Sequence, residues 1–130
     1  MGAMGADGSA RAARGSRDAP ERIFAPVTQR ERLLDAMAKT VSRDGYASTS
    51  VADVLEVARI SRRTFYEQFI DKEDCFLAAY DAIATLCSER VTAAYRAEPQ
   101  WDLALERALD ALLHVLAAEP EFARLGIVEL

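Results

Sequence analysis

The chain has 130 residues and a net charge of −5, which is the size of about one domain. No apolar run approaches the ~18 residues of a membrane span, and the N-terminal stretch "MGAMGADGSARAARGSRDAP" lacks the apolar segment of a secretory signal. We therefore expect a cytoplasmic protein without a membrane partner. Cys75 and Cys87 lack the spacing of a metal-binding pair, so we expect them to be small buried residues rather than a disulfide or a metal site.

Charge is distributed unevenly along the chain. Residues 23–72 hold eight basic and seven acidic residues, whereas residues 73–130 hold four basic and eleven acidic ones. The negative total argues against indiscriminate binding to nucleic acid, but it is compatible with a focused basic surface. A polyanion would therefore meet the N-terminal part of the protein.

Residues 1–26 are rich in glycine, alanine, serine and arginine, and we predict a disordered arm there. Its arginines are either solvated or in contact with DNA phosphates or a minor groove. From Thr28 the apolar residues recur on one face of a helix. Thr28 and Glu31 have the spacing of a capping box at the start of this helix, and Gly45 supplies a left-handed stop.

Two short helices are predicted next. Ser50 and Asp53 have the capping-box spacing at the start of a helix of about eight residues. Ser61 is a good N-cap for the following helix, and a hydrophobic staple between Ile60 and Phe65 fixes its entry angle. On a helical wheel the two phenylalanines of "SRRTFYEQF" fall on one side, while Arg63, Thr64 and Glu67 fall on the other.

Three longer segments complete the pattern. Asp71 and Asp74 predict a further capping box at the start of a helix over residues 72–96. A leucine-rich amphipathic helix follows over residues 101–118, and Pro120 suits the first position of another helix. We find no strand pattern, so the fold class is all-α. Several apolar residues near the end still need a partner surface: Leu125, Ile127, Val128 and Leu130.

Two short helices joined by a tight turn, the second with a basic outer face, are typical of a helix-turn-helix motif. An all-helical adaptor and a helical hairpin inside an enzyme are the alternatives that this pattern leaves open.

The stretch "TQRERLLDAMAKTVSRDGYASTSVADVLEVARISRRTFYEQFIDKEDCFLAAYD" also resembles the N-terminal DNA-binding domain of the TetR/AcrR family of bacterial transcriptional regulators. The matching features are Gly45 with Tyr46, the helix start "TSVADV", and the run "ISRRTFYEQFIDKED". The resemblance implies a three-helix head over residues 28–88, with its helix-turn-helix at about 50–69. A long linking helix would then lead into a partial helical regulatory domain over residues 89–130.

The resemblance also implies a set of DNA contacts. The third helix would enter the major groove, Tyr66 would give its hydroxyl to a phosphate, and Ser50 and Lys72 would hold the DNA backbone on either side. Helix N-termini are general anion sites, so Ser61, at the start of the third helix, is also expected to contact the DNA backbone. The full expected DNA-binding set is Ser50, Arg59, Ser61, Arg62, Arg63, Thr64, Tyr66, Glu67, Gln68 and Lys72.

Residue chemistry leaves alternatives for several members of this set. Arg63 suits a bidentate contact with guanine, and Glu67 either accepts from cytosine or pairs with Arg63 within the helix. Tyr66 is either a phosphate ligand or a half-buried core aromatic. Lys72 is either a backbone contact or a solvated charge.

Two features depart from the family pattern. Arg59 stands where the family often has glycine, and a left-handed conformation costs such a residue of order 1 kcal/mol. A phosphate contact would explain why arginine is tolerated there. In addition, the family's later helices, which complete an effector pocket and a dimer interface, are missing from the sequence.

The leading hypothesis is a repressor that binds a palindromic double-stranded DNA operator. It would act as a homodimer if the missing C-terminal helices are present. A small-molecule effector would regulate it. The second is a truncated interaction protein that pairs with a related full-length chain. An enzyme is disfavoured, because the single histidine, His114, lies among leucines, and no nucleophile–base pair, metal spacing or cofactor loop is visible.

Overall fold

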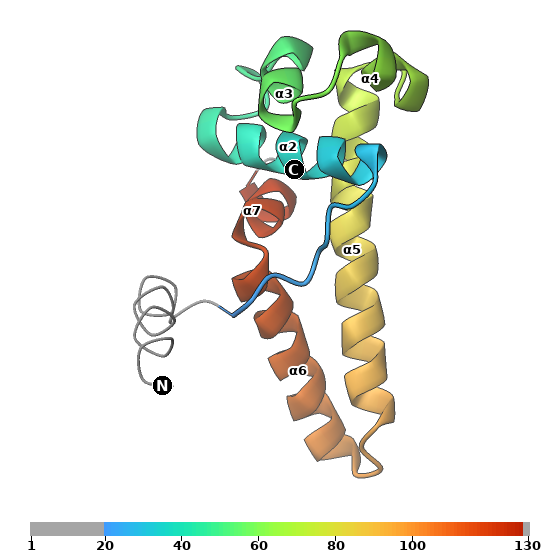
Figure 1. The fold of residues 1–130 in the computed structure, drawn as a ribbon. Coiled ribbons are helices and arrows are strands. Elements are labelled where there is room, and N and C mark those ends of the chain that lie inside the picture. The colour runs from blue at the N-terminus through green and yellow to red at the C-terminus, as the bar shows by residue number, and fades with distance from the viewer. Residues whose placement is uncertain (1–19, 129–130) are drawn as a thin grey trace, which may run out of the picture.

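The computed structural model describes residues 20–128, and within this range it contains six α-helices and no strand. The prediction of an all-α chain is confirmed. Figure 1 shows the helices in order along the chain. They are α2 (Gln29–Asp44), α3 (Val51–Ala58), α4 (Arg62–Gln68), α5 (Lys72–Arg96), α6 (Trp101–Ala118) and α7 (Pro120–Val128).

Local capping signals set where the helices begin. The Thr28 side chain accepts the N–H of Glu31 at 3.0 Å, and Glu31 accepts the N–H of Thr28 at 3.0 Å. Ser50 and Asp53 form the equivalent box before α3. Before α5, the Asp71 side chain accepts the N–H of Asp74, but the Asp74 carboxylate accepts the N–H of Ile70. The third predicted box therefore closes one residue earlier than the sequence suggested.

Helices α2, α3 and α4 and the start of α5 share one core. Leu33, Met37 and Val41 of α2 are fully buried, and so are Val54 of α3 and Phe65 of α4. Because α3 and α4 have only eight and seven residues, this packing must supply most of their stability. The result is a compact head, which lies at the top of the molecule in Figure 1.

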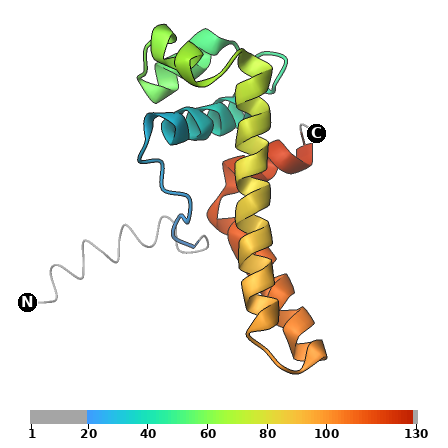
Figure 2. The same ribbon diagram turned by 90° about the vertical axis from the view of Figure 1, so that its right-hand side faces the viewer.

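The lower part of the molecule is a helical hairpin of α5 and α6, and α7 returns from it to contact α2 (Figures 1 and 2). The buried residues of α6 are Ala104, Ala108, Val115 and Ala118. Leu105, Leu109 and Leu113 are 56%, 56% and 58% exposed. These three leucines therefore lie off the packed face, while Leu103, Leu112 and Leu116 are partly buried. None of the described helices is long and apolar enough to cross a membrane.

The arm predicted over residues 1–26 falls partly outside the described range. Residues 1–19 lie outside the residues that the structure describes. Residues 20–27 form no helix, yet Ile23 and Phe24 pack against the core, and Arg22 makes ion pairs with two carboxylates. This part of the predicted arm is a fixed segment in the structure.

Candidate nucleic-acid interface

Helix α4 lies at the outer end of the head, held by two phenylalanines. Phe65 is 0% exposed, Phe69 is 3% exposed, and their ring centroids are 5.6 Å apart. The remaining residues of the helix face outward. The exposed residues are Arg62, Arg63, Tyr66, Glu67 and Gln68, and Thr64 is partly exposed. The amphipathic pattern predicted for "SRRTFYEQF" is therefore present in the structure.

The N-terminus of α4 is organised by its cap. Ser61 accepts the N–H of Thr64 at 3.1 Å, and the two hydroxyl groups lie 3.0 Å apart. An N-cap of this kind typically contributes about 1 kcal/mol to helix stability. The cap fixes where α4 begins, and with it the direction in which Arg62 and Arg63 project.

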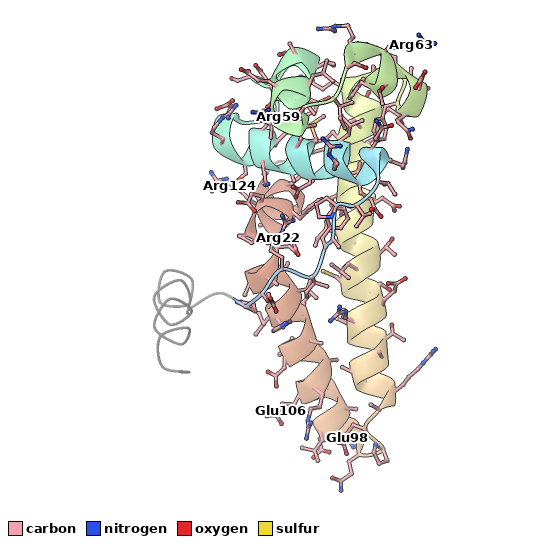
Figure 3. All side chains as sticks on the ribbon, in the orientation of Figure 1. Arg22, Arg59, Arg63, Glu98, Glu106 and Arg124 are labelled. Atoms are coloured by element: carbon pink, nitrogen blue, oxygen red, sulfur yellow. The ribbon has the colours of Figure 1, made fainter. Side chains whose placement is uncertain are left out.

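Arg63 and Glu67 form an exposed pair on the outer side of α4. Their Nε–Oε2 distance is 3.5 Å, and their side chains are 88% and 57% exposed. Such i,i+4 pairs contribute only ~0.3–0.5 kcal/mol. The intrahelical partner role of Glu67 is thus present in the structure, but the pair is weak enough to open when a stronger partner approaches Arg63. Figure 3 places Arg63 at the outer end of the molecule.

Tyr66 is half-exposed beside this pair. It is 48% exposed, and its ring meets that of Phe65 edge-to-face, with centroids 5.0 Å apart. The ring is therefore anchored on the core while the residue remains open to solvent, which is the geometry that a tyrosine needs to present its hydroxyl group.

The turn between α3 and α4 contains the predicted left-handed arginine. Arg59 has φ 59° and ψ 50°, and it is the only non-glycine residue with positive φ in the described part of the chain. Its N–H donates to the carbonyl of Leu55 at 2.8 Å, which satisfies the end of α3. A helix end of this type usually carries glycine, so the backbone of Arg59 is strained.

Lys72 occupies a less open position than the sequence suggested. Its Nζ donates to the carbonyls of Tyr46 at 3.1 Å and Thr49 at 2.9 Å, and it lies 4.1 Å from the centroid of the Tyr46 ring. These contacts tie the first turn of α5 to the turn between α2 and α3. The ammonium group is therefore a clamp within the head, with one of its three donors left after these two bonds.

Two arginines of α2 that sequence reasoning did not single out have a related role. Arg32 donates to the carbonyl of Ala58, the last residue of α3, at 2.8 Å. Arg30 lies 4.6 Å from the centroid of the Phe69 ring and donates to the carbonyl of Gln68 at 3.4 Å. Cations are favourable at helix C-termini. The only sequence signal was two arginines in the first turns of a helix, and nothing local connects them with residues 58 and 68.

The two cysteines are not activated thiols. Burial raises the pKa of Cys75 to about 12, and burial also raises the pKa of the half-buried Cys87. A raised pKa disfavours the nucleophilic thiolate. Among the residues that the structure describes, no group of three or more histidine, cysteine, aspartate or glutamate side chains is placed to hold a metal ion.

Comparison with known proteins agrees with this geometry. Residues 33–79 match the family model "Bacterial regulatory proteins, tetR family". Among solved structures, the fold is similar to that of a TetR family transcription regulator from Marinobacter aquaeolei VT8, with a TM-score of 0.72 and 23% sequence identity. That similarity covers 75% of this chain and 51% of the other chain, so this chain spans about half of its structural relative. No curated protein sequence matches the chain significantly. The matched segment contains α3, α4 and most of α2, so this part of the chain is similar to the bacterial regulatory proteins of the tetR family.

Proposed function

We propose that the chain is a DNA-binding transcriptional regulator that reads the major groove of an operator with α4. The observation that carries the proposal is the division of α4 into two sides. Phe65 and Phe69 are buried in the head, while five polar or aromatic residues on the same short helix are exposed. A helix held in this way can enter a groove about 12 Å wide without unfolding any of the head.

The charge distribution supports this orientation. Arg62 and Arg63 lie at the head end, whereas the net negative charge of the chain is concentrated in residues 73–130, which hold eleven acidic and only four basic residues. Figure 3 shows Arg63 at one end of the molecule and Glu98 and Glu106 at the opposite end. A duplex is therefore attracted to the head and repelled by the far end of the α5–α6 hairpin.

Each exposed residue of α4 has a role in the proposed complex. Arg63 forms two hydrogen bonds with a guanine, and Glu67 either orients it or accepts from a neighbouring cytosine. Tyr66 and Arg62 bind phosphates, and Thr64 and Gln68 extend the base-reading surface. Around the helix, Ser50, Ser61 and Arg59 bind the DNA backbone, and the remaining donor of Lys72 adds one phosphate contact.

At the level of the whole regulator, we propose a repressor that binds a palindromic operator as a homodimer and responds to a small-molecule effector. Support for these finer points comes from the family resemblance alone. The structural relative is about one and a half times as long as this chain, and the similarity covers only 51% of it.

The proposal is tested by selecting bound sequences from random duplex DNA, with the complex sized by light scattering. Arg63→Ala is expected to lower affinity for the selected site by about 1–3 kcal/mol and to relax the preference at one base pair. Arg124→Ala, which removes an exposed arginine of α7, is the matched control and should leave both unchanged. A uniform loss on all sequences would make Arg63 a phosphate contact, and failure to enrich any sequence would overturn the proposal.

A second candidate function is favoured by one observation. Trp101, Leu105, Leu109 and Leu113 recur every four residues along α6 and are 72%, 56%, 56% and 58% exposed. Contiguous exposed apolar surface of this kind marks an interaction face. In this alternative the chain pairs through α6 with a related full-length protein, and DNA binding is secondary. A monomer in light scattering that binds DNA weakly, and forms a complex with such a relative, would favour it.

A further inference from the structure

A buried carboxylate between α6 and α7 holds the segment that precedes α2. Glu119 is 0% exposed. Its Oε2 accepts the backbone N–H groups of Ile23 and Phe24, each at 2.6 Å. Its Oε1 accepts Nε and Nη2 of Arg22 at 2.9 and 2.7 Å. A carboxylate removed from water needs such partners, and bonds from a guanidinium are among the strongest.

The same arginine also reaches the head. Nη2 of Arg22 donates to Oδ1 of Asp35, on α2, at 2.8 Å. Asp35 is 7% exposed, and Lys39 pairs with its other oxygen at 3.1 Å. Burial alone would lower the pKa of Arg22, but its hydrogen bonds to Asp35 and Glu119 outweigh burial and raise that pKa, so the guanidinium stays charged. One side chain thus joins residues that are 97 and 13 positions away in the sequence.

An aromatic contact accompanies the polar network. The ring of Phe24 lies 4.9 Å from that of Phe122, which is on α7 and 1% exposed. Phe122 also lines a cavity of about 110 Å³ among α5, α6 and α7, together with Tyr80 and Cys87. Figure 1 shows the segment crossing from α2 to the side of α6, and Figure 3 shows Arg22 beside the α6–α7 junction.

We infer that Arg22–Phe24 form a strap that positions the α6–α7 junction and the head as one unit, with Arg22 and Glu119 as the positioning residues. Through this strap a displacement of the α6–α7 junction reaches α2, in addition to the direct packing of α7 on α2 and any route through α5. Helix α2 holds the C-terminal end of α4 through Arg30, so the strap influences the helix that would read DNA. Only this last step rests on the proposed function.

The strap is tested without DNA by hydrogen–deuterium exchange at the amides of Ile23 and Phe24. Glu119→Gln keeps the shape of the side chain but removes its charge and one acceptor oxygen. We expect exchange at both amides to become at least tenfold faster, equivalent to about 1.4 kcal/mol. Asp35→Asn should accelerate the same amides by ~threefold or more, although Asp35 bonds neither of them, because it loosens Arg22.

Matched controls come from the same helices. Glu106→Gln removes an exposed carboxylate of α6, and Asp44→Asn removes the partner of Arg43 on α2. Neither should alter exchange at the two amides. If Glu119→Gln fails to fold by circular dichroism, Arg22→Lys replaces it, since a lysine retains the charge but cannot fork between two carboxylates.

The outcomes are distinct. Unchanged exchange in Glu119→Gln and Arg22→Lys would overturn the strap, and acceleration in Glu119→Gln but not in Asp35→Asn would overturn its coupling to the head. In a parallel measurement, Glu119→Gln should change affinity for a selected DNA site by ~threefold or more, and Glu106→Gln should not. If the unaltered chain binds no DNA, the proposed function fails while the exchange result still decides the strap.

Discussion

The role of Lys72 can be decided by replacing it with methionine, which keeps the stem and removes the ammonium group. The structure places Nζ on the carbonyls of Tyr46 and Thr49 and against the Tyr46 ring. Hydrogen bonds from charged donors contribute up to ~1.5–3 kcal/mol each, and less where the donor is partly exposed. With both carbonyls able to recruit water after the change, we expect Lys72→Met to lower the free energy of unfolding by about 2 kcal/mol in total.

The assay is urea denaturation followed by circular dichroism, in parallel with DNA binding at several salt concentrations. Lys39→Met is the control, because Lys39 is the only other lysine in the sequence, its side chain is 47% exposed, and its partner Asp35 keeps the ion pair with Arg22 after the change. That change should cost only ~0.3–0.5 kcal/mol. An unaltered urea midpoint in Lys72→Met, with a salt slope smaller by ~0.9, would show that Lys72 is a phosphate contact and that the clamp reasoning is wrong.

Two other predictions concern the turn and the thiols. Arg59→Gly should raise stability by about 1 kcal/mol by relieving the left-handed strain, seen as a higher melting temperature, while DNA affinity falls because the guanidinium is lost; a lower melting temperature would contradict the strain. Iodoacetamide at pH 8 should alkylate Cys87 slowly and Cys75 only after unfolding, since Cys75 is 0% exposed and burial raises its pKa to about 12. Equal labelling of both thiols in the folded protein, measured by mass spectrometry, would show that the core of the head opens readily.

Local signals were sufficient to predict the helices of the head. Thr28, Ser50 and Ser61 each act on a backbone N–H three residues away, so the information needed to begin those helices lies within one turn of sequence. The same holds for Phe65 and Phe69, whose four-residue spacing places both on the buried side of α4. Periodicity and capping are properties of a short window, and a single sequence contains them in full.

Contacts between distant segments could not be predicted in this way. Lys72 was expected to face solvent or DNA, because the carbonyls that it binds belong to a turn more than twenty residues earlier. The partners of Arg22 and Arg32 are likewise set by how the helices pack. On α6 the leucines suggested the packed face, but the buried positions belong to Ala104, Ala108, Val115 and Ala118, because the distance between two helices decides which side chains fit.

Six of the basic residues between positions 22 and 72 therefore fall into two groups with different chemistry. Arg22, Arg30, Arg32 and Lys72 bind carboxylates or carbonyl oxygens inside the protein. Arg62 and Arg63 are exposed on α4, where Arg63 forms a weak pair with Glu67 of the same helix. A count of basic residues would assign both groups to DNA binding, although the residues of the first group already form hydrogen bonds that hold the helices together. Sequence-specific binding needs both kinds of cation, since a base contact discriminates only when the helix that carries it is held in a fixed orientation.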